Sequence, residues 1–195
     1  MSAVAVPEGR AQREMSGPVM GMVLFVASEA MFFAAFFGGY FTIRENAKVW
    51  PPRGIPPLEI GVATILTVIL ITSSLVIQLS LRSIRRGEQR RAVAFLGLTI
   101  ALGVAFLLLQ LYDYSQLGFG VKDGTFGTLF YVMTGIHMAH VFGGVVFLGL
   151  VLGQAMGGSL SPSNHDSLSA GAIYWDFVDV VWLLLFTTFY LLTPR

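Results

Sequence analysis

Five long apolar segments constrain this chain more than any other feature of its sequence. A helix needs about 20 residues, at about 1.5 Å rise per residue, to cross the hydrocarbon core of a bilayer. Segments of that length occupy residues 18–43, 58–81, 92–112, 126–153 and 170–192. The sequence therefore predicts an all-α integral membrane bundle of five transmembrane helices, in one domain at residues 18–195, with a flexible cytoplasmic tail at residues 1–17.

The composition supports a membrane protein and excludes several functions. Only 12% of the residues are charged, about half the share that a soluble domain uses. Cysteine is absent, which excludes disulfides, thiolate metal sites and catalytic thiols. No basic face indicates nucleic acid binding, and no phosphate-binding loop, nucleophile elbow or metalloprotease motif is present.

The arginines predict the orientation. The connection 82-RSIRRGEQRR-91 holds five Arg, whereas the connection between the fourth and fifth segments holds neither Lys nor Arg. Basic connections stay on the cytoplasmic side of a membrane. With five spans, this places the N-terminus in the cytoplasm and the C-terminus outside.

Ionisable residues inside a span are costly and are therefore the candidates for function. Glu29 lies about a third of the way along the first segment, among apolar neighbours. It is either an acid that handles protons or contacts lipid, or a buried carboxyl that fixes helix packing through hydrogen bonds. The sequence leaves both interpretations open.

Two further pairs lie three residues apart and so share a helix face. His137 and His140 could ligate a metal or a heme, but the chain has only three His and no Cys. We therefore favour structural or lipid-headgroup contacts for them. Asp176 and Asp179 could bind a hard cation or relay protons, and we favour pairing with donors on a neighbouring helix. Asp113 lies at a span end, where we expect water to reach it.

Four segments, taken in order, resemble the subunit III family of the heme-copper terminal oxidases, and the resemblance runs from about Met15 to the C-terminus. They are 28-SEAMFFAAFFGGYF-41, 107-LLLQLYDY-114, 123-DGTFGTLFYVMTGIHMAHVFGG-144 and 174-YWDFVDVVWLLLF-186. Each alone is a weak signal, and together they are specific. The chain is similar to a five-helix bacterial form that lacks the first two of the seven spans of the mitochondrial form. It also departs from the family pattern at Asp176, where the family usually has His.

The resemblance implies a non-catalytic core subunit of a bacterial aa3-type cytochrome c oxidase in the aerobic respiratory chain. Such a subunit packs on subunit I, binds lipid in the plasma membrane, and supports proton uptake and turnover stability. Glu29 matches the family's carbodiimide-reactive carboxylate, His137 and His140 match its paired histidines, and Asp179 matches the acid of its Val-Asp-Val-Val signature.

The same resemblance implies which groups this chain binds and which partners it has. The chain is expected to bind no cofactor or metal and to contain no catalytic residue, since the partner subunits hold the heme and copper. Phospholipid and subunits I and II are the expected partners. A small subunit IV and a cytochrome bc complex in a supercomplex are further candidates.

Other functions remain as alternatives. Subunit III of a quinol oxidase is the nearest, and a related subunit beside nitric oxide reductase is another member of the same group. A stand-alone ion transporter using Glu29, Asp176 and Asp179 belongs to a different class, but secondary transporters usually contain internal repeats, and none is visible. A membrane enzyme with a carboxylate or His metal site is a third class, which the scarcity of His disfavours.

Overall fold

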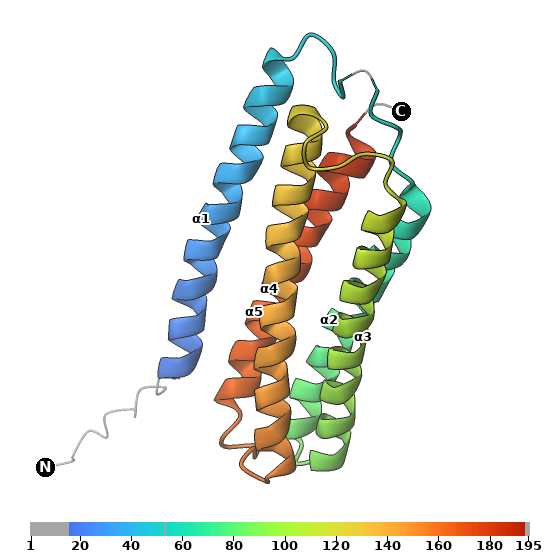
Figure 1. Ribbon diagram of the computed structural model, residues 1–195. Helices are drawn as coiled ribbons and strands as arrows, with labels where there is room; N and C mark the ends of the chain where they lie inside the picture. The colour runs from blue at the N-terminus through green and yellow to red at the C-terminus, as the bar shows by residue number, and fades with distance from the viewer. Residues whose placement is uncertain (1–15, 53, 194–195) are drawn as a thin grey trace, which may run out of the picture.

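Five helices make up the bundle in a computed structural model that describes residues 16–52 and 54–193. Each is long and apolar enough to span a membrane, which confirms the predicted fold class (Figure 1). Their bounds are α1 Gly17–Asn46, α2 Ile60–Arg85, α3 Gln89–Gln116, α4 Gly124–Met156 and α5 Asp166–Phe186, with a π-helical turn η1 at Thr187–Leu191. The predicted tail lies outside the described residues except for its last two positions, and α1 already includes Gly17.

Local sequence signals set several helix ends. Pro18 occupies the first turn of α1, where its missing N–H has no helical partner to lose. Gly87 forms the tight connection between α2 and α3 with φ of 77°, a left-handed conformation that favours glycine. Gly158 follows α4 with φ of 75°. The arginine-rich connection thus lies at the same end of the bundle as the α4–α5 connection (Figure 1).

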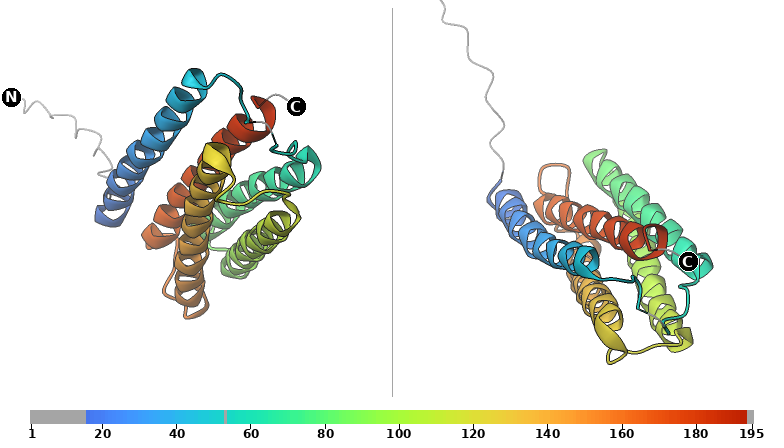
Figure 2. Two further views of the ribbon diagram at one scale, coloured as in Figure 1. Left: turned by 45° about the horizontal axis from the view of Figure 1, so that its top comes forward. Right: turned by 90° about the horizontal axis from the view of Figure 1, so that it is seen from above.

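The helices form two layers, and α5 lies in the middle of the first layer. In the view from above, α1, α5 and α2 lie side by side, and α4 and α3 lie beneath them (Figure 2). The contacts agree, because α5 packs against α1, α2 and α4, whereas α1 packs substantially only against α5. In the most apolar 18-residue stretch of α5, 61% of the residues are buried inside the bundle, whereas in that of α1 only 6% are buried. Helix α5 is therefore the core of the bundle, and α1 is a peripheral helix with most of its surface open.

Small residues let α5 approach its neighbours. A Cβ atom added at Gly103 of α3 would lie 2.6 Å from the ring of Trp175, and one at Gly144 of α4 would lie 3.0 Å from it. Close approach at small residues is a general device of membrane helix packing. At Gly38 and Gly39 of α1 an added Cβ would meet nothing within 4 Å, so the glycine pair of α1 makes no such contact within this chain.

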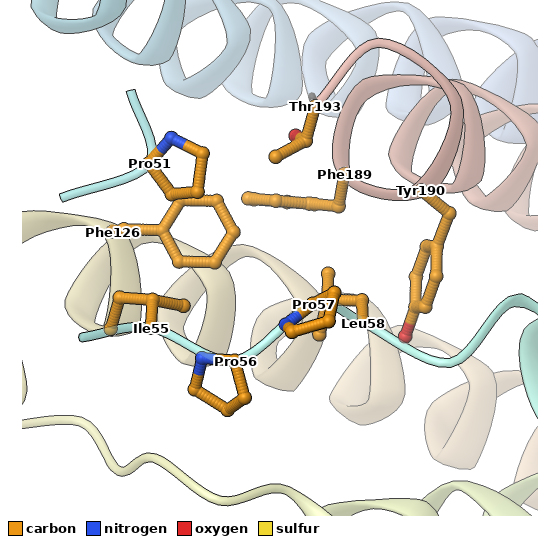
Figure 3. A pocket seen from close by; sticks show the side chains of 9 residues that line it. All are labelled: Pro51, Ile55, Pro56, Pro57, Leu58, Phe126, Phe189, Tyr190 and Thr193. Atoms are coloured by element: carbon orange, nitrogen blue, oxygen red, sulfur yellow. The ribbon is translucent and has the colours of Figure 1, made fainter. Parts of the chain in front are cut away.

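The loop after α1 covers the end of the bundle opposite the arginine-rich connection and packs on an aromatic cluster there (Figure 3). It encloses a cavity of about 20 Å³, which has room for about one water molecule. The residues that line it are Pro51, Ile55, Pro56, Pro57, Leu58, Phe126, Phe189, Tyr190 and Thr193. This cavity is too small for a ligand, and a larger pocket of about 420 Å³ lies at the same end beside Glu59 and Asp113.

We predict that Gly103→Ala destabilises the bundle by about 1–3 kcal/mol, because the added methyl group collides with the rigid ring of Trp175. Thermal unfolding of the purified protein in detergent measures this change. Gly97→Ala on the same helix is the control, since an added Cβ there meets nothing within 4 Å. Ala is the better helix former, so the control should be neutral or stabilising. Equal melting temperatures for the two variants would contradict the predicted role of Gly103.

Candidate functional site

Glu29 and His140 form a contact between the peripheral helix α1 and helix α4. The Oε2 atom of Glu29 lies 3.0 Å from Nε2 of His140. The two side chains are 20% and 18% exposed, so the pair lies at the surface of the bundle and is not enclosed within it. Of the five residues that the sequence predicts for the site, the structure brings these two into direct contact.

The hydrogen bonds of His140 determine how many protons this pair holds. Its Nδ1 atom lies 2.8 Å from the carbonyl oxygen of Ile136, and a carbonyl oxygen can only accept. Nδ1 therefore carries a hydrogen and donates it. The contact between Nε2 and Glu29 then needs one further proton, which resides either on the carboxyl or on the imidazole. The two side chains share one proton, which lies either on the carboxyl of Glu29 or on Nε2 of His140.

The pair lies beside an apolar groove between α1, α4 and α5. The groove has a volume of about 220 Å³ and is lined by Met22, Phe25, Gly143, Phe147 and Tyr174. The hydroxyl of Tyr174 donates to the carbonyl oxygen of His140 over 3.0 Å. The ring of Phe33 meets that of His140 edge-on, with 5.0 Å between the ring centroids.

His137 does not join His140. It is fully buried, stacks on Trp182 with 5.4 Å between the ring centroids, and meets Phe106 edge-on. Both of its ring nitrogens lack a hydrogen-bond partner. The two histidines therefore lie in different environments, with His140 directed toward α1 and His137 toward Trp182 and Phe106.

Asp176 joins α5 to α2. Its Oδ1 accepts a hydrogen bond from the hydroxyl of Ser74 over 2.8 Å, and its Oδ2 accepts one from Nε2 of Gln78 over 2.7 Å. Both donors lie on α2, on the neighbouring helix as the sequence interpretation favoured. This carboxyl therefore has a defined structural role in holding two helices together.

Two other carboxyls are buried more deeply. Asp179 is 6% exposed, and among the described residues neither of its carboxyl oxygens has a hydrogen-bond partner, so the pairing that we favoured for both acids is seen for Asp176 alone. Asp113 is 5% exposed and receives a weak hydrogen bond from Gln110 at 3.5 Å. Asp113 also lines a pocket of about 420 Å³ together with Glu59, and the expectation that water reaches it at the end of its span stays a prediction. Across residues 16–52 and 54–193, no three His, Asp or Glu side chains are placed to hold a metal ion.

The profile of the family described as "Cytochrome c oxidase subunit III" matches residues 8–193. The chain belongs to the cytochrome c oxidase subunit III family. A relative from Thermostichus vulcanus, named "Cytochrome c oxidase subunit 3", is 39% identical over 90% of this chain and 87% of its own length. The protein of that name from Synechocystis is 37% identical over 89% of this chain and 75% of its own length. The one from Sus scrofa is 38% identical over 87% of this chain and 67% of its own length.

The structure of this subunit III family member also contains polar contacts that the sequence interpretation missed. The indole N–H of Trp175 donates to Ser73 over 2.8 Å, and that of Trp182 donates to Thr67 over 3.0 Å. Thr67, Ser73, Ser74 and Gln78 are among the polar residues of the largely apolar helix α2. Their spacing on one side of α2 was the available signal that α2 contacts a helix carrying polar groups.

We predict that Gln78→Leu destabilises this subunit III family member by about 1–2 kcal/mol, because Oδ2 of Asp176 loses its protein donor on α2. Thr72→Val is the control, since Thr72 is exposed on the same helix. Chemical unfolding in mixed micelles measures both changes. In a double-mutant cycle with Asp176→Asn, the two effects should be non-additive. Strict additivity would show that the Gln78–Asp176 contact contributes nothing.

Proposed function

We propose that this chain is the non-catalytic subunit III of a bacterial aa3-type cytochrome c oxidase, in the aerobic respiratory chain of the plasma membrane. The support is the family match over residues 8–193 and the printed names of the relatives. The subunit packs on subunit I, binds phospholipid, and supports proton uptake and turnover stability. Heme and copper are held by subunits I and II, and this chain supplies a scaffold with no cofactor of its own.

The orientation in this proposal is an N-terminus in the cytoplasm and a C-terminus outside. It is supported by the basic residues at one end of the bundle, which include Arg82, Arg85, Arg86, Arg90 and Arg91. The connection between α4 and α5 lies at the same end and contains neither Lys nor Arg, so the orientation depends on the arginines of the α2–α3 connection. A small subunit IV and a cytochrome bc complex remain candidate partners within this proposal.

The groove beside the Glu29–His140 pair is the place that we propose for a phospholipid chain. Its lining is apolar and lies between three helices, which suits an acyl chain and excludes a charged ligand. The polar pair lies one turn further along α1 and α4 and gives the groove a polar end. Lipid bound there would fill the space between the peripheral helix and the core of the bundle.

We further propose that Glu29 acts by attaching α1 to the bundle. The helix buries only Phe33 and Tyr40, so it has few apolar contacts to hold it. Three polar contacts fix it. They are the Glu29–His140 pair in its first half, a hydrogen bond of 2.7 Å from Arg44 to the carbonyl oxygen of Leu192 near its outer end, and a weaker contact of 3.5 Å between the hydroxyls of Tyr40 and Thr193. Loss of the first contact should release the cytoplasmic half of α1.

We predict that Glu29→Leu weakens attachment of this subunit to the oxidase, whereas Glu29→Gln leaves attachment and turnover nearly unchanged. The amide of Gln can still donate to Nε2 of His140, but Leu cannot. A lost contact of about 1–2 kcal/mol corresponds to an association about five to thirty times weaker. The measurements are the amount of this subunit per heme after purification and the steady-state turnover rate.

Met31→Leu is the control for both variants, because Met31 is 75% exposed on the same helix. If Glu29→Gln lowers turnover while the subunit is fully retained, Glu29 transfers protons and the attachment role is wrong. If no heme-bearing subunit copurifies with the wild-type chain in mild detergent, the proposed oxidase function itself is wrong.

The electron donor gives a second test. We expect the copurified complex to contain heme A in its reduced spectrum and to oxidise reduced cytochrome c. Copper analysis should find the electron-entry copper of subunit II. A complex that oxidises quinol and lacks this copper would instead identify the chain as subunit III of a quinol oxidase.

A further inference from the structure

A polar crevice enters the bundle from the end that carries the arginine-rich connection. It lies over α5 between the start of α1 and the end of α2, and its volume is about 770 Å³. Its lining runs from Asp166, at the first turn of α5, to Asp176. Ten residues of helix separate these two, which is a depth of about 15 Å. That depth is about half of the hydrocarbon thickness of a bilayer.

Polar groups lie at the mouth, along the length and at the inner end of this crevice, between apolar residues such as Leu81 and Ile173. Near its mouth, Nε of Arg85 donates to Nε2 of His165 over 3.3 Å. Ser169 lies further along α5. At the inner end, Gln78 and Asp176 meet. A lipid chain cannot satisfy such groups, and charged residues at this depth otherwise face a protein interior or a water-filled space.

The inner end also has hydrogen-bonding capacity left over. A carboxylate offers about four acceptor sites, and Asp176 uses one on each oxygen, for Ser74 and for Gln78. Because Asp176 lines the crevice, the remaining sites face it. Water fits these sites, since a polar and roomy cavity holds water readily.

We propose that this crevice is filled with water from the cytoplasm and that Asp176 is a carboxyl in direct proton exchange with that water near the middle of the membrane. The site takes water and protons, and no larger ligand is needed to explain its lining. This inference goes beyond the proposed oxidase function and rests on one part of it. It depends on the orientation, in which the arginine-rich end faces the cytoplasm.

The absence of Cys from this chain allows a direct test by cysteine accessibility. Ser169→Cys and Ile173→Cys place a thiol at two depths in the crevice. Leu150→Cys is a depth-matched control for Ile173→Cys, because the first lies six residues from the end of α4 and the second seven residues from the start of α5. Leu150 is 66% exposed on the outside of the bundle. Val180→Cys, 54% exposed, lies one turn beyond Asp176.

Each variant is expressed in the intact complex in membrane vesicles, and a membrane-impermeant cationic methanethiosulfonate is added from the cytoplasmic side. Labelling is measured on the band of this subunit. Because only an ionised thiol in water reacts, Ser169→Cys and Ile173→Cys should react at least about ten times faster than Leu150→Cys. Val180→Cys should react as slowly as Leu150→Cys, which marks the inner end of the crevice at Asp176.

Two results would overturn the proposal. One is an Ile173→Cys thiol that reacts no faster than the Leu150→Cys thiol while the subunit is assembled, which would mean that lipid or another protein fills the crevice. The other is reaction only from the outer side of the membrane. Ser169→Cys changes a single atom of a side chain near the mouth, so it keeps the test valid if Ile173→Cys fails to assemble. Failure of copurification with heme would affect the oxidase proposal and leave these labelling results standing.

Discussion

The hydrogen bonds between α5 and α2 are the interaction on which the rest of this bundle depends. In a bilayer the lipid is as apolar as the helices, so burial of apolar side chains gives little net attraction between them. Close packing and hydrogen bonds must supply it. Trp175 and Trp182 donate to α2, and Asp176 accepts from α2 twice. Four hydrogen bonds thus fix one helix pair, and α3 and α4 then pack around it.

Helix α1 is held only loosely at the edge of the bundle, because it offers few sites for close packing or hydrogen bonds. Its surface offers Phe33 and Tyr40 to the core and leaves large apolar residues such as Leu24 and Met31 exposed. Such a surface suits contact with lipid or with other membrane helices. In the longer relatives, of which this chain covers between 67% and 87%, additional sequence lies outside the matched region. Within the described residues, Glu29 and Arg44 make the clearest polar contacts between the first helix and the rest of the bundle.

Hydropathy predicts the number of helices in this fold, because each span must satisfy its own backbone and expose apolar side chains. It does not predict which neighbour each side chain meets. Residues three apart differ by about 60° around a helix, and on α4 that difference sends His140 toward α1 and His137 toward Trp182. Asp113 shows the same limit, since its burial depends on loops whose paths have no periodic signal. The partners of Asp176 were visible in the sequence as Ser74 and Gln78, but only the packing of α2 on α5 identifies them as a pair of donors.

Asp176 and Asp179 show how position on one helix separates two chemically identical groups. Asp176 has two donors from α2 and lines a polar crevice. Asp179, one turn deeper, is enclosed with neither oxygen bonded. A charge in the first position is stabilised by hydrogen bonds and by water, whereas a charge in the second has neither, and an unpaired buried charge is among the most costly features of a protein interior. The two carboxyls thus lie in different environments although they are three residues apart on one helix. Only the carboxyl of Asp176 can exchange protons with the aqueous phase without a rearrangement of the helices.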